Sequence, residues 1–230
     1  MRQIKMKVLP VIHILNKQQA IEQAELLVKA KCDGFWLINH GGDDELTLSL
    51  AVDLSKRYPE LMVGVNLLSH SAESALNATI EHDLKYLWLD FAGVHSLTPD
   101  NALLERQKLL SQKHNITIFA GTAFKYQRHE PNHVQAAELA QSHGLVVTTS
   151  GSGTGHAADL NKIKAMSCAV DGHLAVASGL TPENLSDYHP YVEYALVATG
   201  ISQDDHHFDS EKLVMFMNRV QELNSIKVLK

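Results

Sequence analysis

Short apolar runs recur along the chain, and the stretches between them have the spacing of amphipathic helices. Residues 18–31 place apolar side chains at steps of three and four, the pattern of a helix that packs one face on a sheet. Further helices are expected over residues 45–58, 72–83, 101–114, 132–143, 160–169 and 210–223, with a shorter one over 182–188. The apolar runs predict strands over residues 8–15, 34–40, 62–68, 86–91, 116–124, 145–150, 174–179 and 194–200.

These eight strand and helix units predict the fold. The strands are continuous apolar runs without strict alternation, which is typical of strands covered on both faces. Eight units within 230 residues favour an α/β protein of the (β/α)8, or TIM, barrel type, with residues 1–230 forming one domain. An open, doubly wound sheet would normally have only roughly five or six strands.

Residues with strong positional preferences mark the ends of several expected helices. Ser71 is a candidate N-cap, and Gly144 and Gly172 are candidate stops after two helices. Proline follows threonine at 98–99 and again at 181–182, where two further helices are expected to begin. Turn and cap chemistry therefore agrees with the boundaries that the apolar runs give.

Composition and charge narrow the range of functions. Hydrophobic residues make up 45% of the chain and charged residues 20%, which is ordinary for a globular protein and too interrupted for membrane insertion. A formal net charge of -6, with no stripe of Lys and Arg, argues against nucleic acid as a partner. Cys32 and Cys168 match no metal or redox motif, so we expect reduced thiols and a cytoplasmic location. Because barrels often form dimers, we also expect a homo-oligomer.

Polar residues end nearly every expected strand. In a barrel, these strand ends and the loops after them carry the functional groups, since the interior is filled by side chains. Asn39, Asn66, Thr149 and Ser150 stand where hydrogen bonds to a substrate are expected. The sequence therefore predicts one polar site at the barrel mouth, formed by His13, Asn39, His40, Asn66, Asp90, Lys125, Thr149, Ser150, Ser178, Gly179, Thr199 and Gly200.

Glycine-containing segments follow the last three expected strands, at residues 148–155, 178–184 and 198–201. Glycine lets the backbone approach a ligand closely, and N–H groups at a helix start favour an anion. Barrels often bind phosphate after their last two strands. These observations predict a site for a small phosphorylated molecule or another anion, formed by Gly151, Gly153, Ser178, Gly179, Thr199 and Gly200. The simpler interpretation is that the segments are tight turns.

Three titratable residues at the mouth are candidate catalytic groups. Lys125 could neutralise a ligand anion, form a Schiff base or act as an acid, or it could be a solvated lysine at the start of a loop. His13 could be an acid/base group or a core histidine bonded to a carbonyl. Asp90 could orient His13, pair with Lys125, accept a proton or hold a ribose hydroxyl.

Fourteen histidines raise the question of a metal site. His13, His40 and Asp90 could hold a divalent ion only if their strands point inward together, and no local ligand spacing supports such a site. His206 and His207 are expected as a surface pair after the eighth strand. We therefore expect neither a metal nor another cofactor.

Five segments carry a resemblance to a known family. Residues 11–15 (VIHIL), 63–68 (VGVNLL), 119–125 (FAGTAFK), 149–155 (TSGSGTG) and 178–184 (SGLTPEN) occur in the order and approximate spacing of the BtpA family. This family of barrel proteins is named for a photosystem I biogenesis protein and includes many bacterial members. The chain resembles a shortened, divergent member, because residues 15–18 lead directly into a helix where the family carries a proline-rich stretch. Asp90 also stands where an asparagine is common.

Two main functional hypotheses follow, with a third beside them. The first is an enzyme that acts on a small substrate of the sugar-phosphate or phosphoribosyl type by isomerisation, lyase or glycosyl-transfer chemistry, with Lys125 and His13 in acid/base or electrostatic roles. The second is a non-catalytic assembly or regulatory factor that retains a ligand pocket, as the family's name implies, and exposes an apolar patch to a partner. The third is metal-dependent hydrolysis at His13, His40 and Asp90.

Overall fold

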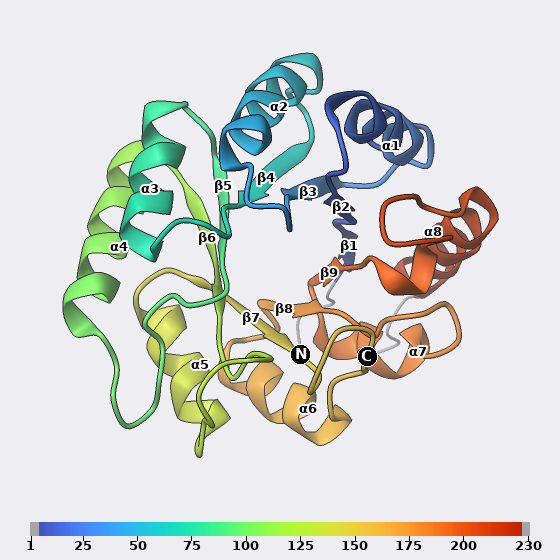
Figure 1. Ribbon diagram of the computed structural model, residues 1–230. Helices are drawn as coiled ribbons and strands as arrows, with labels where there is room; N and C mark the ends of the chain where they lie inside the picture. The colour runs from blue at the N-terminus through green and yellow to red at the C-terminus, as the bar shows by residue number, and fades with distance from the viewer. Residues whose placement is uncertain (1–4, 227–230) are drawn as a thin grey trace.

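The computed structural model describes residues 5–226 and shows parallel strands surrounded by helices (Figure 1). The strands are β1 (Lys7–Val8), β2 (Val11–His13), β3 (Gly34–Ile38), β4 (Met62–Asn66), β5 (Tyr86–Leu89), β6 (Thr117–Gly121), β7 (Val146–Ser150), β8 (Leu174–Ala177) and β9 (Tyr194–Leu196). Neighbouring strands are hydrogen-bonded in the order β1-β9-β8-β7-β6-β5-β4-β3-β2.

The first strand closes this sheet into a barrel. It has two parts, because β1 and β2 are separated only by residues 9–10. β1 pairs with β9, and the Val11 N–H donates to the carbonyl of Val197 over 2.8 Å. β2 pairs with β3, and the Trp36 N–H donates to the carbonyl of Pro10 over 2.8 Å. Both ends of the sheet thus bond to one continuous segment, and the predicted (β/α)8 barrel is confirmed.

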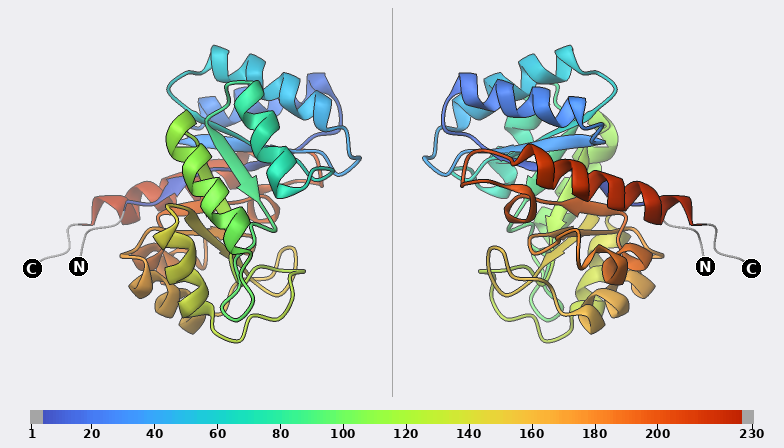
Figure 2. Two further views of the ribbon diagram at one scale, coloured as in Figure 1. Left: turned by 90° about the vertical axis from the view of Figure 1, so that its left-hand side faces the viewer. Right: turned by 90° about the vertical axis from the view of Figure 1, so that its right-hand side faces the viewer.

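Helices follow the strands and cover the outside of the barrel, as the two side views also show (Figure 2). They are α1 (Lys17–Lys29), α2 (Asp44–Arg57), α3 (Ala72–Glu81), α4 (Asn101–His114), α5 (His133–Ser142), α6 (Leu160–Ala169), α7 (Leu185–Tyr188) and α8 (Ser210–Ser225), with short 3-10 helices η1 (His189–Tyr191) and η2 (Thr199–Ile201). All but α7 and the 3-10 helices begin with an N-cap side chain that accepts a backbone N–H. Among residues 5–226, no helix combines the length and apolarity needed to cross a membrane.

Two apolar cores lie on the two faces of the sheet. The outer core joins the strands to the helices. The inner core fills the barrel, and its aromatic rings meet edge to face: Trp36 lies 4.9 Å from Phe119 and 5.8 Å from Trp88 between ring centroids. Side chains alternate between the two cores along each strand, as Val11 and His13 face inward while Ile12 faces the helices. The inner core therefore forms a closed floor beneath the strand ends.

Some boundary predictions were right and others were wrong. Ser71 caps α3 by accepting the Ser74 N–H, and Gly144 follows α5 with a φ of +74°, both as predicted. The two prolines do not begin helices. Asp100 caps α4 because its carboxylate accepts the Leu103 N–H, so the helix begins after Pro99 rather than at it. The turn at 181–184 is closed instead by the Asn184 side chain, which accepts the Thr181 N–H, and α7 is short.

Candidate functional site

The carboxyl ends of the strands surround a cavity of about 310 Å³. Its floor is apolar and belongs to the inner core, with Trp88 and Leu196 among its residues. Its walls carry polar side chains from nearly every strand end or following loop: His13, His40, Asn66, Asp90, Lys125, Thr154, Ser178 and Thr199. The structure thus brings together, in one cavity, the predicted catalytic residues and two of the predicted phosphate-binding residues.

His13 is a largely buried imidazole on the wall of this cavity. Burial is the main cause that lowers its pKa to about 4, and the nearby charges of His40, His206 and Lys125 act in the same direction. The rings of His13 and His40 pack edge to face with centroids 5.0 Å apart. His13 is therefore neutral near pH 7 and carries a lone pair that can accept a proton.

His206 contributes to this part of the site, although the sequence predicted only a surface pair with His207. Its Nδ1 lies 3.0 Å from the His13 carbonyl oxygen, and its own carbonyl accepts a hydrogen bond from the Gln19 side chain. The loop after η2 thus folds back over the end of β2. Sequence spacing could not show this contact, because 193 positions separate the two histidines.

Asp90 and Lys125 face the cavity from adjacent loops. Burial raises the pKa of Asp90, while a hydrogen bond from Asn66 and the charge of Lys125 oppose this rise. Burial lowers the pKa of Lys125, and the charge of Asp90 opposes that shift. Within residues 5–226 the two groups form no direct ion pair. Lys125 Nζ instead donates to Thr154 Oγ1 over 3.2 Å, and the Asp90 carboxylate accepts a hydrogen bond from Asn66. Both therefore keep bonding capacity for a ligand.

The turn that carries Lys125 is held in an unusual conformation. Ala123 and Tyr126 have φ values of +47° and +64°, in a region of backbone conformation that residues other than glycine rarely occupy. The Gln127 side chain ties the turn to its surroundings, because it donates to the carbonyls of Asp90 and Gly121 and accepts the Phe124 N–H. The sequence contains no local signal for this arrangement, because the partners come from two different strands.

Residues at the end of β7 support the same turn from the other side. Ser150 Oγ accepts the Lys125 N–H over 2.8 Å, and Thr149 Oγ1 donates to the Ala123 carbonyl over 3.2 Å. Lys162 Nζ donates to the carbonyls of Ala123 and Ser150 over 2.6 and 3.1 Å. The structure therefore places the Thr149 and Ser150 hydroxyls where they position Lys125 rather than on the cavity wall.

Asn39 lies beside the site but does not line the cavity. Its side chain is buried, and Oδ1 accepts the Asp43 N–H over 3.4 Å at the start of α2. His40, the next residue, reaches the cavity wall instead. The sequence placed both residues at the mouth, and strand alternation explains why only His40 faces the cavity, since it has the inward parity of Trp36 and Ile38.

The three glycine-containing segments lie together, as predicted. The Gly155 N–H donates to Ser178 Oγ over 2.8 Å, and Ser178 Oγ donates to the Gly153 carbonyl over 3.3 Å. A methyl group added to Gly155 would lie 3.6 Å from Thr199 Cγ2. The hydroxyls of Thr154, Ser178 and Thr199 consequently form one end of the cavity.

Several of these glycines serve the packing of the loops on one another. A methyl group on Gly151 or Gly179 would collide with the backbone of residues 156–157, and one on Gly200 would collide with the Leu180 carbonyl. Gly153 faces the ring of His156. Within the part of the chain that the structure describes, the N–H groups of Gly179 and Gly200 donate to no protein acceptor. Neither glycine lines the mouth cavity itself, although the adjacent Ser178 and Thr199 do.

The three proposed metal ligands His13, His40 and Asp90 do not form a ligand set. Among residues 5–226, no three His, Cys, Asp or Glu side chains lie close enough together to hold a metal ion. The hypothesis of metal-dependent hydrolysis thus finds no geometric support in these side chains.

Comparison with solved structures supports the fold. KGPDC from Streptococcus mutans in complex with D-ribose 5-phosphate aligns with a TM-score of 0.70 and 10% identity over 95% of this chain and 98% of that one. Phosphoribosyl anthranilate isomerase from Thermus thermophilus aligns with a TM-score of 0.66 and 17% identity, over 95% of this chain and 100% of that one. The 3-keto-L-gulonate-6-phosphate decarboxylase from Vibrio cholerae aligns with a TM-score of 0.67 and 10% identity, over 95% of this chain and 99% of that one.

Comparison at the level of sequence gives no further assignment. No protein-family model matches the chain, and no curated protein matches it. The BtpA resemblance is therefore not supported by these comparisons beyond the barrel itself. The chain is a TIM barrel whose structural neighbours include enzymes named for phosphorylated compounds.

Proposed function

We propose that this protein is an enzyme that binds a small sugar phosphate or phosphoribosyl compound at the mouth of the barrel and catalyses a proton-transfer reaction on it. One observation carries the proposal. A single cavity is lined by the three candidate catalytic groups, His13, Asp90 and Lys125, and by the hydroxyls of Ser178 and Thr199. A ligand in this cavity would contact both sets at once.

The hydroxyl end of the cavity suits a phosphate. Phosphate oxygens accept hydrogen bonds from hydroxyls and from backbone N–H groups. Thr154, Ser178 and Thr199 supply the hydroxyls, and Gly179 and Gly200 follow two of the strands with N–H groups that are not bonded within the described chain. The Lys125 ammonium, which donates to Thr154, adds a positive charge beside them.

The same cavity also suits acid/base chemistry. His13 is neutral near pH 7 and can accept a proton from a carbon or a hydroxyl. Lys125 can stabilise the negative charge that then develops on the ligand, and Asp90 can donate or accept a proton because burial raises its pKa. Isomerisation and lyase reactions of sugar phosphates both need such a base and such a charge-stabilising group. Glycosyl transfer stays a further possibility for the same site.

The structural neighbours suggest the first ligands to test. One of them was solved in complex with D-ribose 5-phosphate, and two others are named for phosphorylated substrates. Their identities of 10–17% support only the fold, so the choice of ligand is part of the proposal. We include in the proposal the idea that the chain is a divergent BtpA-like protein, on the basis of the five sequence segments that resemble this family.

Binding and turnover can be tested separately. Thermal denaturation with D-ribose 5-phosphate and with D-ribose should show stabilisation by the phosphorylated sugar alone. Replacement of Ser178 by Ala together with Thr199 by Val should reduce this stabilisation, while Ser142→Ala, at a surface helix end, should not. Equal stabilisation by the two sugars, or no effect of the double replacement, would contradict the phosphate end of the proposal.

Turnover is detected without knowledge of the product. Sugar phosphates incubated with the protein in deuterated water should incorporate deuterium at the carbon from which His13 removes a proton. Lys125→Met should abolish this incorporation with little change in thermal stability. If Lys125→Met retains full incorporation, its proposed role is excluded.

A second function has one observation in its favour. Phe91, Leu97 and Tyr126, in the loops after β5 and β6, are 61%, 69% and 73% exposed. Exposed apolar side chains near a ligand pocket suit a non-catalytic assembly or regulatory factor that contacts a partner protein. Such a factor would be stabilised by ligand but would produce no deuterium exchange with any sugar phosphate.

A further inference from the structure

A second hollow lies beside the barrel mouth, between the loop that follows β6 and the loop that follows β7. It has a volume of about 660 Å³, about twice that of the mouth cavity. Lys125 and Tyr126 line both hollows and separate them. The proposed reaction at the mouth uses no other residue of this second hollow, which we call the side groove.

Basic side chains outnumber acidic ones in the lining of the side groove. Besides Lys125, its walls contain Arg128, His129, His133 and Lys162, and two acids, Glu130 and Asp159. The groove thus contains three cationic side chains, those of Lys125, Arg128 and Lys162, and two imidazoles. The groove attracts an anion only if the negative charges of Glu130 and Asp159 do not cancel those of the cations.

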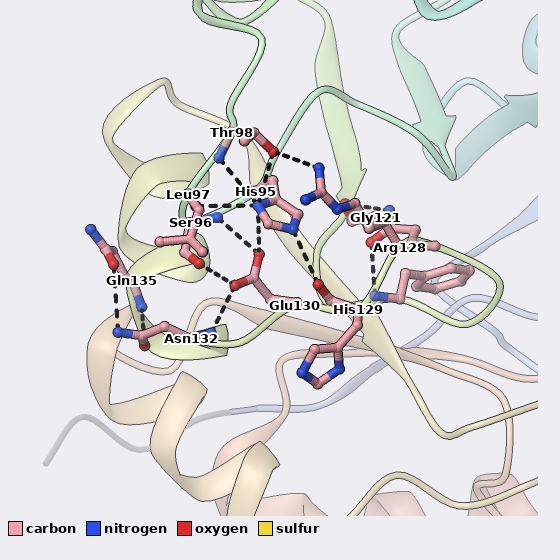
Figure 3. Close-up of polar contacts among 12 residues, drawn as sticks. His95, Ser96, Leu97, Thr98, Gly121, Arg128, His129, Glu130, Asn132 and Gln135 are labelled. Carbon is pink, nitrogen blue, oxygen red and sulfur yellow. Dashed lines mark hydrogen bonds and ion pairs between the residues drawn. The ribbon is translucent and has the colours of Figure 1, made fainter.

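Glu130 does not present its charge to the groove. Its carboxylate accepts hydrogen bonds from the Ser96 N–H over 2.9 Å, from the Ser96 hydroxyl and from the Asn132 N–H over 2.8 Å. The side chain is only 4% exposed, and Figure 3 shows the carboxylate turned toward the loop of residues 95–98. These bonds to the charged form lower the pKa of Glu130, although burial opposes them.

Asp159 is committed in part to its own helix. It is the N-cap of α6, and its Oδ1 accepts the Lys162 N–H over 2.9 Å. A capping carboxylate is stabilised by the N–H groups of the helix start, which balance much of its charge. It makes no ion pair with Arg128 or Lys162 among the described residues.

Among residues 5–226, the cations of the groove form no ion pair with a carboxylate. Lys162 Nζ donates only to backbone carbonyls, those of Ala123 and Ser150, which leaves one of its N–H donors for another acceptor. Burial lowers the pKa of Lys162 to about 8, and the nearby charge of Asp159 opposes this shift without cancelling it. Arg128 is exposed and donates from Nη1 to the Thr98 hydroxyl over 3.3 Å (Figure 3).

We propose that the side groove is a second oxyanion site, which binds a phosphate or carboxylate group through Arg128 and Lys162, separately from the phosphate end of the mouth cavity. An oxyanion there would add negative charge beside both cations and accept hydrogen bonds from their unused N–H donors. The site does not depend on the proposed reaction. Because the hollows share Lys125 and Tyr126, the anion could belong to a second substrate or to the far end of a long one.

Crystals soaked in sodium selenate test the two sites together, because anomalous scattering locates each selenate. We expect one peak beside Arg128 and Lys162 and another beside Ser178 and Thr199. A mouth peak without a groove peak would overturn the second site and leave the proposed function intact. A groove peak without a mouth peak would support the second site and contradict the phosphate end of the proposed function. The absence of both peaks would overturn both proposals.

Titration with inorganic phosphate and with acetate tests the groove in solution and distinguishes the two chemistries. Isothermal titration calorimetry of Arg128→Gln should show at least a fivefold loss of affinity for one class of sites, whereas Arg106→Gln, which changes an arginine on α4 paired with Glu73, should show none. Preference for phosphate or for acetate identifies the group that is bound. Unchanged affinity for both anions in Arg128→Gln would overturn the proposal.

Lys162→Met removes the second cation but also its bonds to two carbonyls. Lys212→Met is the matched control. Lys212 lies on helix α8, away from the groove, and its ammonium also donates to a backbone carbonyl, that of Ser202. We expect weaker anion binding in Lys162→Met only. If this variant does not fold, the result for Arg128→Gln, an exposed position, decides the matter alone.

Discussion

Asn66 Nδ2 donates a hydrogen bond to Asp90 Oδ1 over 3.2 Å and so joins the ends of β4 and β5 at the barrel mouth. The bond favours the ionised form of this carboxyl group and so opposes the rise in its pKa that burial causes. Asn66 is itself buried, at 3% exposure, so its amide has few alternatives to this partner. The pair therefore sets the charge of Asp90 in the candidate site.

Replacement of Asn66 by Leu should raise the pKa of Asp90 further, because the donor to its charged form is lost while burial remains. The carboxyl carbon of Asp90, followed by NMR as a function of pH, gives this pKa directly. Asn39→Leu serves as control, because Asn39 is also buried at a neighbouring strand end but bonds to Asp43. An unchanged or lower Asp90 pKa in Asn66→Leu would show that the bond does not control this charge.

The depressed pKa of His13 makes the stability of the protein depend on pH. The imidazole titrates near 6.5 when exposed and at about 4 in the folded protein. Between these values the unfolded chain binds the proton and the folded protein does not, so stability is lost as the pH falls through this window. From about pH 7 to pH 5 the loss due to His13 is about 2 kcal/mol.

Urea denaturation of the wild-type protein and of His13→Gln at both pH values measures this loss. The wild-type protein should lose about 2 kcal/mol more than the variant on acidification, because glutamine does not titrate. All other histidines are present in both proteins, so the difference reports His13 together with its coupling to His40 and His206. Equal losses in the two proteins would mean that His13 keeps an ordinary pKa in the fold.

The sequence was sufficient to predict which strand ends form the mouth, because the period of the barrel places all of them at one end. Strand alternation adds the direction of each side chain. His13, Asn66 and Asp90 share the inward parity of Trp36 and Trp88, and all three line the cavity. Thr149 has the opposite parity, which explains why its hydroxyl bonds to the Ala123 carbonyl instead.

Contacts between loops could not be predicted in the same way. Lys162 lies in the first turn of α6, where a lysine is ordinarily solvated, and reaches back across 39 positions to Ala123. Gln127 reaches back 37 positions to the carbonyl of Asp90. Neither residue type nor spacing signals such a bond, since it depends on how adjacent loops fold over the strand ends. The packing role of two glycines could not be predicted from the sequence either, because Gly151 and Gly200 lie against neighbouring loops.

Gln127 should be important for both stability and the order of the Lys125 turn. Gln127→Ala leaves the Phe124 N–H and the carbonyls of Asp90 and Gly121 without this partner. Loss of such partly buried bonds costs about 1–3 kcal/mol. Urea denaturation measures this cost, and hydrogen exchange at the Phe124 amide should become faster. Gln135→Ala, at an exposed position on α5, should change neither quantity.

Gly179 and Gly144 separate the two reasons for which a chain needs glycine. Both have nearly the same positive φ, +75° and +74°, so an alanine at either position adopts a left-handed backbone that costs about 1–2 kcal/mol. A methyl group on Gly144 meets nothing within 4 Å, whereas one on Gly179 collides with the backbone of residues 156–157. Backbone cannot move away as a flexible side chain can, so Gly179→Ala should cost at least about 2 kcal/mol more than Gly144→Ala by denaturation.

Gly179→Ala should also push the loop after β7 away from Ser178 and weaken binding of D-ribose 5-phosphate, which Gly144→Ala should leave unchanged. Equal costs for the two variants would mean that the loops after β7 and β8 do not pack against each other as closely as the Gly179 contacts require.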